Sequence, residues 1–384
     1  MTILGMIFFL LVAALVYGAV NAYIFFKAHA AFHFGARSGG AVIAFMALMF
    51  LLFFIGHGLE RAGIHAGARA ALIAAGAWLG IIFLFFSSSL LVDLYRLAVW
   101  LAGLAAGRSL AAAMPSPALA FFLPAAATIA LNVAGYFEGK DIRVETLTIR
   151  TGKLPEGVQR LRIVQISDIH LGPVIRGRRA ADIFDRVRAL APDILISTGD
   201  LVDQSVCDMA SLVGPLLALS APQGKFAVTG NHEFYAGLEQ SLRFTRQAGF
   251  VVLRGEVAAA GGITLAGVDD SEAERFEPEA PADERQVLSK AAGGGYVILL
   301  KHRPTIARDA LGLFDLQLSG HTHKGQIFPF SLLTRLVYVI DAGWLDLDKG
   351  SHLYVSRGTG LWGPPIRLLA PPEITVIDLV RAGR

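Results

Sequence analysis

Histidine and acidic residues recur as short motifs in the second half of this 384-residue chain. In chain order they read Asp168-x-His170, Gly199-Asp200, Gly230-Asn231-His232-Glu233, His302 and Gly320-His321-x-His323. Imidazole and carboxylate groups that converge from distant parts of a chain are the ligands that a two-metal hydrolytic centre requires. The chain has ten histidines, and half of them fall within these motifs. The pattern therefore predicts a dinuclear metal site.

The spacing of the first two motifs suits metal binding. In an extended segment, residues two apart point to the same side, so Asp168 and His170 could reach one ion. Gly199 allows a tight turn before Asp200. A carboxylate can bridge two cations through its two oxygens, and this role suits Asp200.

The remaining motifs supply ligands of a different kind. Asn231 offers a neutral carbonyl oxygen, and His232 beside it cannot easily face the same ion. Glu233 is expected either to orient His232 or to structure the turn. His321 and His323 could bind one ion each or share one.

Each motif follows a short apolar run that is typical of a strand. The runs before the first four motifs cover residues 161–166, 194–197, 225–228 and 296–300. A helical period at Ile183, Phe184, Val187 and Leu190 separates the first two runs, and Pro192 marks its end. Repeated strand–motif–helix units predict a mixed α/β fold in which the loops gather at the carboxyl ends of the strands.

The first third of the chain has a different composition. Residues 1–26, 38–59, 70–92 and 109–137 contain no Asp, Glu, Lys or Arg. A bilayer core needs about 20 apolar residues of helix, so we expect four spans at about 3–26, 39–59, 70–92 and 115–137. The first stretch lacks a basic region before it and is followed by further spans, which favours a retained helix over a signal peptide.

The third span leaves two alternatives open. The apolar run 97–107 is too short to cross a bilayer alone, so it either extends the third helix or lies along the membrane surface. Asp93 and Arg96 are three apart and could pair on a helix. We expect a transmembrane domain over 1–138 and a catalytic domain over 139–384.

Charge gives an expectation for orientation. Four spans place both ends of the chain on one side, which carries Arg61, Arg69, Lys140, Arg143, Arg150 and Lys153. The other side carries Lys27, Arg37, Arg96 and Arg108. The excess of two basic residues favours a cytoplasmic catalytic domain, whereas a fifth span would reverse this orientation.

Composition also excludes some classes of protein. The net charge is +3, and the basic residues form no stripe with interleaved aromatics, so nucleic-acid binding has little support. The single cysteine, Cys207, excludes an internal disulfide framework and a cysteine-rich zinc site.

The order of the motifs resembles that of the calcineurin-like metallophosphoesterase superfamily over roughly residues 160–380. The resemblance implies an αββα sandwich of mixed sheets. It implies one metal ion held by Asp168, His170, Asp200 and His323, and a second held by Asp200, Asn231, His302 and His321. His232 matches the catalytic histidine of the family. Segments 318–326, 354–360, 364–367 and 372–373 are similar to the YkuE-type branch, whose members often carry membrane segments.

These features together predict a membrane-anchored enzyme that hydrolyses a phosphodiester or a diphosphate with two divalent cations, with a small-molecule or lipid-linked substrate. Mixed nitrogen and oxygen ligands suit Mn, Fe or Zn. Lys324 replaces a glycine common in the branch, and it either contacts a substrate phosphate or points to solvent. Arg357 and Arg367 are further candidate phosphate contacts, with a structural role in the closing strand as the favoured alternative. The alternative is a membrane transporter or sensor that a phosphoesterase domain regulates.

Overall fold

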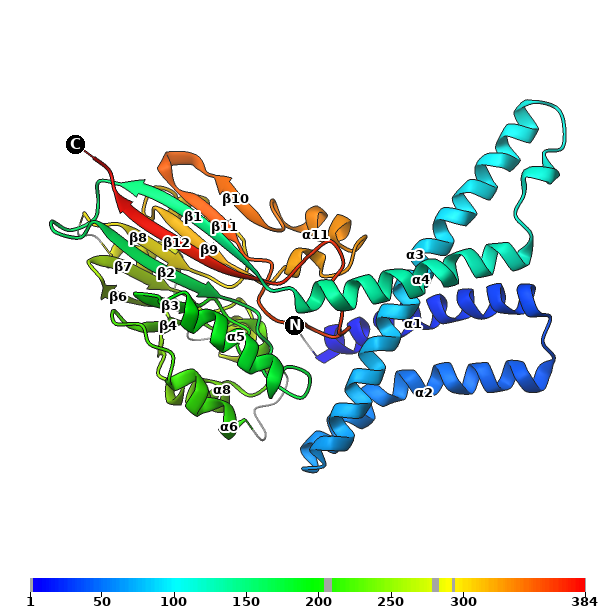
Figure 1. The fold of residues 1–384 in the computed structure, drawn as a ribbon, viewed down its shortest axis with the longest axis horizontal. Coiled ribbons are helices and arrows are strands. Elements are labelled where there is room, and N and C mark those ends of the chain that lie inside the picture. Colours follow the sequence, from blue (N-terminus) through cyan, green and yellow to red (C-terminus); the bar gives the residue numbers. More distant parts are fainter. Residues whose placement is uncertain (1–2, 204–208, 278–282, 292–293, 384) are drawn as a thin grey trace. The chain divides into compact units, whose positions relative to one another are not determined.

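A computed structural model describes residues 3–203, 209–277, 283–291 and 294–383 (Figure 1). Cys207 lies outside these ranges. The chain divides into two compact units. One contains Met1–Phe137 and Gly363–Ile366, and the other contains Glu138–Trp362 and Arg367–Arg384.

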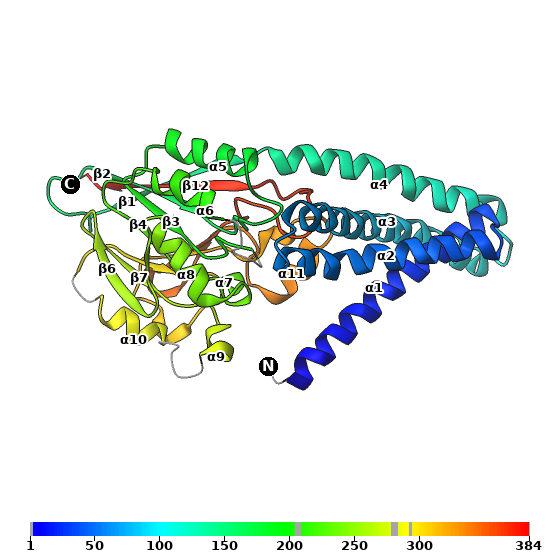
Figure 2. The ribbon, with the colours of Figure 1, turned by 90° about the horizontal axis from the view of Figure 1, so that it is seen from below.

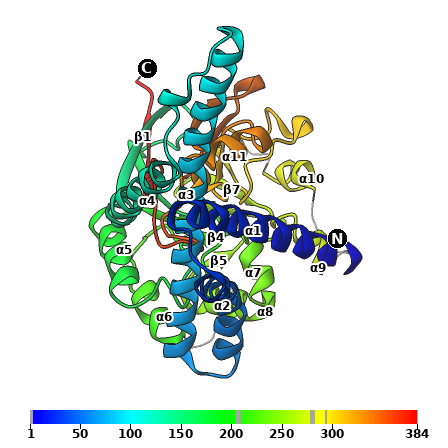
Figure 3. The same ribbon diagram turned by 90° about the vertical axis from the view of Figure 1, so that its right-hand side faces the viewer.

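The first unit consists of long apolar helices. They are α1 (Ile3–Phe32), α2 (Ala36–Arg61), α3 (His65–Ala105) and α4 (Pro117–Lys140), with the short 3-10 helix η1 (Ala111–Ala113) before α4. The four α-helices are long and apolar enough to cross a membrane. In Figures 1 and 3, α3 crosses α1 and α2 steeply. Because α3 is continuous to Ala105, the run 97–107 extends the third helix.

Small and charged residues fix the contacts between these helices. At Gly56 of α2, a Cβ atom would lie 2.6 Å from Cγ of Leu72 in α3, so a glycine allows the two helices to approach closely. Asp93 of α3 accepts hydrogen bonds from Tyr23 and Lys27 of α1, and Arg96 Nη1 lies 3.6 Å from its Oδ1. The predicted pairing of Asp93 with Arg96 is therefore part of a larger cluster that joins α1 to α3.

The second unit contains two six-stranded sheets. The first has the order β1 (Arg143–Thr151), β12 (Glu373–Arg381), β2 (Arg160–Ile166), β3 (Ile194–Ser197), β4 (Lys225–Ala227) and β5 (Val251–Val252). The second has the order β10 (Gly343–Asp346), β11 (His352–Val355), β9 (Leu316–Ser319), β8 (Val297–Leu300), β7 (Ile263–Gly267) and β6 (Glu256–Ala260). Both sheets are mixed, because β12 runs antiparallel to β2, and both β6 and β10 run antiparallel to their neighbours.

Helices cover the outer faces of both sheets. These helices include α5 (Arg178–Ala189), α6 (Ala210–Leu217), α8 (Leu238–Gln247) and α10 (Glu284–Ser289). The remaining helices of this unit are α7 (Asn231–Tyr235), α9 (Ala273–Phe276), α11 (Ser331–Val337), η2 (Arg308–Ala310), η3 (His323–Gly325) and η4 (Asp348–Gly350). Figure 2 shows α5 and α10 on opposite sides of the stacked sheets.

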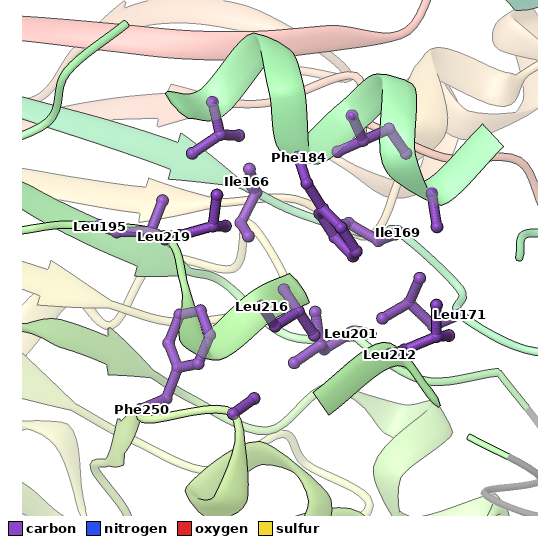
Figure 4. Packing of buried hydrophobic residues seen from close by; sticks show 14 of the residues in the cluster. Ile166, Ile169, Leu171, Phe184, Leu195, Leu201, Leu212, Leu216, Leu219 and Phe250 are labelled. Atoms are coloured by element: carbon purple, nitrogen blue, oxygen red, sulfur yellow. The ribbon is translucent and has the colours of Figure 1, made fainter. Parts of the chain in front are cut away.

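Side chains that alternate between the two faces of each strand build the core. On β2, Ile163 faces the second sheet and packs with Leu300 and Leu318. Its neighbour Val164 belongs to the layer beneath the outer helices, where Phe184 of α5 is also buried (Figure 4). This period of two buries both faces of the first sheet. The predicted αββα sandwich is confirmed.

Candidate metal centre

The motif residues lie just beyond the carboxyl ends of five strands. Strands β2, β3 and β4 of the first sheet precede Asp168, Asp200 and Asn231 respectively, whereas β8 and β9 of the second sheet precede His302 and His321. A hydrogen bond of 2.8 Å between His302 Nδ1 and the carbonyl oxygen of Thr198 joins the two sheets at this point. Both sheets therefore contribute side chains to one centre.

The first group of candidate ligands contains Asp168, His170 and His323, all buried. Nε2 of His170 lies 3.1 Å from Nε2 of His323, which lies 3.4 Å from Oδ1 of Asp168. Ligands bonded at about 2.1 Å to one ion stand about 3.0–3.4 Å apart. Two imidazole nitrogens and a carboxylate oxygen at these separations therefore fit a shared cation.

The second group contains Asp200, His302 and His321. Nε2 of His302 lies 3.3 Å from Oδ2 of Asp200, 3.3 Å from Oδ1 of Asn231 and 3.1 Å from Nδ1 of His321. All four predicted ligands of the second ion thus converge.

Asp200 connects the two groups through a single oxygen. Its Oδ2 also lies 3.8 Å from Nε2 of His170, whereas its Oδ1 accepts a hydrogen bond from the backbone N–H of His232 at 2.9 Å. The sequence suggested a bridge through both oxygens. Here Oδ2 faces both groups of candidate ligands, and Oδ1 holds the turn that carries His232.

Backbone strain is concentrated at these residues. Asp168, His170, Asp200, His321 and His323 all have φ between 49° and 70°, a region that residues other than glycine seldom occupy. Close approach adds a second constraint, because a Cβ atom at Gly320 would lie 2.0 Å from Oγ of Ser167 and 2.2 Å from Oδ2 of Asp168. Strained conformations of this kind are retained mainly at functional sites.

Glu233 structures the turn, the second of the two roles expected for it. Its carboxylate accepts backbone hydrogen bonds from Asp200 at 3.0 Å, Leu201 at 2.8 Å and Gly230 at 2.7 Å. It therefore joins the loop after β3 to the loop after β4, and so fixes the position of Asp200 relative to Asn231.

Asp203 is a functional candidate that the sequence reasoning missed. Its Oδ1 lies 3.2 Å from Nδ1 of His232 and 3.6 Å from Nδ1 of His170. An aspartate three residues after Asp200, on the same loop, was the available signal. Asp203 also donates its backbone N–H to Leu171 at 2.9 Å, which holds this loop against the one that follows β2.

Burial and neighbouring charged side chains shift the pKa values of groups in the centre. Burial alone would lower the pKa of His232, but Asp200, Asp203 and Glu233 outweigh it and raise this pKa to about 9. Burial, followed by the charge of His302, lowers the pKa of His321 well below its usual value. Burial would raise the pKa of Asp200, but His302 and His232 hold it well below its usual range. The protein's own charges thus favour an ionised Asp200, a neutral His321 and a protonated His232.

The three predicted phosphate contacts lie in different surroundings. Lys324 is half-buried in η3, directly after His323. Arg357 is tied to Glu145 and lies 2.8 Å from Glu373. Arg367 is 0% exposed, and its Nη atoms donate to protein acceptors that include Gly360 and His323. These contacts favour structural roles for both arginines and leave Lys324 as the more accessible candidate.

The family model of the calcineurin-like phosphoesterases matches residues 161–325. The chain is 43% identical over 258 residues to an uncharacterized metallophosphoesterase of Aquifex aeolicus, covering 66% of this chain and 98% of that protein. It is 32% identical over 260 residues to the uncharacterized metallophosphoesterase YkuE of Bacillus subtilis, and the match covers 64% of this chain and 88% of YkuE.

A third relative also matches part of the apolar region. It is a Bos taurus protein named "Transmembrane protein with metallophosphoesterase domain", which is 35% identical over 310 residues, covering 75% of this chain and 68% of that protein. The resemblance drawn from the motifs is thus confirmed along nearly the whole length of the Aquifex relative. With the two sheets and the converging motifs described above, these matches show that the chain belongs to the calcineurin-like phosphoesterases.

Proposed function

We propose that the chain is a membrane-anchored, dinuclear phosphoesterase that uses an activated water to hydrolyse a phosphodiester or a diphosphate. The observation that supports this most directly is the convergence of two ligand groups on Oδ2 of Asp200. Seven candidate ligands from five strand ends meet there, and none of the motif positions has been replaced.

The proposal assigns a role to each side chain. Asp168, His170, Asp200 and His323 would hold one cation. Asp200, Asn231, His302 and His321 would hold the second. The buried carboxylates and imidazoles, which offer mixed oxygen and nitrogen ligands, suit Mn, Fe or Zn. Two such cations would lower the pKa of a water and offset negative charge on the phosphoryl oxygens.

His232 would act on the leaving group. With a pKa of about 9, it carries a proton at neutral pH and could donate it to the leaving oxygen. Oδ1 of Asp203 lies 3.2 Å from Nδ1 of the ring, which leaves Nε2 as the nitrogen available to a substrate. Lys324 would contact a substrate phosphate, since it follows His323 directly.

Hydrolysis of a soluble aryl phosphodiester tests this proposal. The purified full chain, loaded with Mn²⁺, should cleave the diester, and metal analysis should find two ions per chain. Asp200→Asn and His232→Ala should each abolish cleavage, whereas Asp185→Asn on the surface of α5 should retain it. The proposal fails if the wild-type protein, loaded in turn with Mn, Fe and Zn, hydrolyses no monoester, diester or diphosphate.

The membrane part of the proposal rests on the four apolar helices and on the transmembrane relative. We propose that all four helices span the bilayer and that the phosphoesterase domain faces the cytoplasm, as the basic residues near the span ends favour. A site held at a bilayer is suited to a lipid-linked phosphate or diphosphate.

Two experiments address these points. Protease added to sealed vesicles of known orientation should cut the phosphoesterase domain only when its own side is accessible. A screen of lipid extracts for phosphate release would identify the substrate class. Cleavage of soluble nucleotides alone, with no activity on any lipid fraction, would contradict a lipid-linked substrate.

A further inference from the structure

An exposed apolar surface lies next to the candidate metal centre, on and around α11. It consists of Phe330, Leu332, Leu333, Leu336, Val337 and Val339, which we call the α11 patch. Leu336 is 82% exposed, Val339 77% and Val337 74%. Contiguous apolar surface of this kind is uncommon on a soluble domain and usually marks an interaction site.

The helical spacing places these side chains together. Leu332 and Leu336 are four residues apart, as are Leu333 and Val337, so the four form one stripe along α11. Residues 326–340 contain no acidic residue, and Arg335 is their only charged one. Arg335 Nε donates to Asp341 at 3.1 Å, so the single cation lies at the polar border of the stripe.

The patch is firmly joined to the loop that carries His321 and His323. A Cβ atom at Gly325 would lie 2.4 Å from the backbone nitrogen of Ser331, so η3 and the start of α11 are in close contact. Thr322 Oγ1 donates to the carbonyl oxygen of Asp341 at 2.6 Å. The ring of Tyr338 lies 5.7 Å from that of His321. Figure 1 shows α11, in orange, beyond the ends of the second sheet.

The composition of the patch favours a lipid surface over a protein partner. Its side chains are aliphatic except for Phe330, and Arg335 is the single charged residue of segment 326–340. This is the pattern of elements that insert into the headgroup boundary of a bilayer. Only Asp141 and Ile142 separate α4 from β1, so a bilayer crossed by α4 is within the reach of the chain.

We propose that the α11 patch inserts into the bilayer surface and holds the metal centre at the level of the lipid headgroups. This inference rests on the proposed membrane anchoring and extends it: the domain would dock on the membrane through its own surface, in addition to its helices. A phosphate attached to a lipid would then reach the centre without leaving the bilayer.

Fluorescence quenching in the full-length chain tests the insertion. In a Cys207→Ser background, Leu336→Cys is labelled with an environment-sensitive fluorophore and reconstituted in vesicles. Lipids that carry a nitroxide on the acyl chain should reduce its emission about twofold, and aqueous iodide should have little effect. The matched control is Leu217→Cys on α6, an exposed leucine away from the patch, where iodide should quench and the nitroxide lipid should not.

Two outcomes would overturn the proposal. If iodide quenches the label at position 336 as strongly as at position 217, the patch is in water. If neither reagent quenches it, protein covers the patch, either the apolar helices of the same chain or a second copy.

A second measurement separates this proposal from the proposed activity. Leu336→Glu should hydrolyse the soluble aryl diester at the wild-type rate. Its rate on the active lipid fraction in vesicles should fall at least about tenfold, because a buried carboxylate opposes insertion. Leu217→Glu should change neither. If the wild type hydrolyses no diester, the proposed activity is wrong, but the quenching experiment still tests membrane insertion. If Leu336→Glu lowers both rates equally, the proposed docking is wrong, but the proposed activity is not affected.

Discussion

At the scale of single residues, Asp203 connects the two kinds of chemistry proposed for the centre. One of its carboxylate oxygens faces Nδ1 of His170, a candidate ligand, and Nδ1 of His232, the candidate proton donor. An aspartate behind an imidazole keeps the proton on Nδ1 and so leaves Nε2 free for a metal or a substrate. Asp203 can therefore influence both metal binding and proton transfer.

Replacing Asp203 should change the pH dependence of activity. Its carboxylate helps to raise the pKa of His232 to about 9, so Asp203→Asn should lower this pKa and cause His232 to lose its proton at lower pH. We expect the alkaline limb of kcat to move to lower pH, and kcat at neutral pH to fall about 10–100-fold. The pH profile of aryl diester hydrolysis measures both effects. Asp185→Asn is the control, and an unmoved alkaline limb would contradict the role of Asp203.

Arg367 is the second residue whose contacts reach the candidate metal centre. It is completely buried, and it donates hydrogen bonds to the carbonyl oxygens of Arg357, Gly360 and Ala370. Its Nη2 also lies 3.0 Å from Nδ1 of His323. Burial, with Arg367 as the next cause, lowers the pKa of His323, so the ring stays neutral as a metal ligand must.

Removing this guanidinium should therefore affect both stability and metal content. Arg367→Met leaves several buried carbonyl oxygens without a donor, which should lower the free energy of unfolding by about 3–5 kcal/mol. We expect a lower melting temperature and weaker Mn²⁺ binding, measured by thermal denaturation and by metal titration. Arg243→Met, on the exposed face of α8, is the control. Unchanged metal affinity would limit Arg367 to a purely structural role.

At the scale of elements, β12 joins parts of the chain that are far apart in sequence. It lies between β1 and β2 and pairs with both. Its Asp378 accepts hydrogen bonds from Arg160 Nη2 at 2.8 Å and Arg162 Nε at 3.0 Å, both on β2. The contacts of these arginines outweigh the effect of burial and lower the pKa of Asp378.

The sign of this shift predicts a loss of stability in acid. Because the pKa of Asp378 is lower in the folded state, its contribution is present above about pH 4 and is lost as the pH falls through the folded-state pKa. Asp378→Asn should remove about 1 kcal/mol or less at pH 7, since Arg160 is half exposed, and should flatten the decline of stability below pH 4. The free energy of unfolding, measured at pH values between about 3 and 7, tests this prediction. Equal acid sensitivity of the two proteins would contradict it.

The same elements show what the sequence could and could not predict. The strands before Asp168, Asp200, Asn231 and His302 could be predicted because each is a short apolar run that stops at a motif. The order of strands could not, since the pairing of β12 with β2 joins segments about two hundred residues apart and leaves no local pattern. Asp203 was missed because its role depends on how two loops pack together.

At the scale of the whole molecule, the candidate centre lies where the two sheets meet. Asp168, Asp200 and Asn231 follow strands of the first sheet, whereas His302 and His321 follow strands of the second. Buried carboxylates of Asp168, Asp200 and Glu233 also lie close together, and burial raises the pKa of Asp168 and of Glu233. Cations bound there would offset this repulsion and connect the sheets.

Removing the cations should therefore destabilise the entire phosphoesterase domain. Ions that bind only the folded state add about 2.7 kcal/mol at a free concentration one hundred times Kd, so a chelator should lower the melting temperature and added Mn²⁺ should restore it. The ligand variant Asp200→Asn should melt at a lower temperature and respond little to either reagent, because both ligand groups share this carboxylate. Near-ultraviolet circular dichroism of the full chain in detergent follows the transition. If metal analysis confirms complete removal while the melting temperature stays constant, the cations do not hold the sheets together, and the rigidity of the centre must come from Glu233, Asp203 and Arg367 alone.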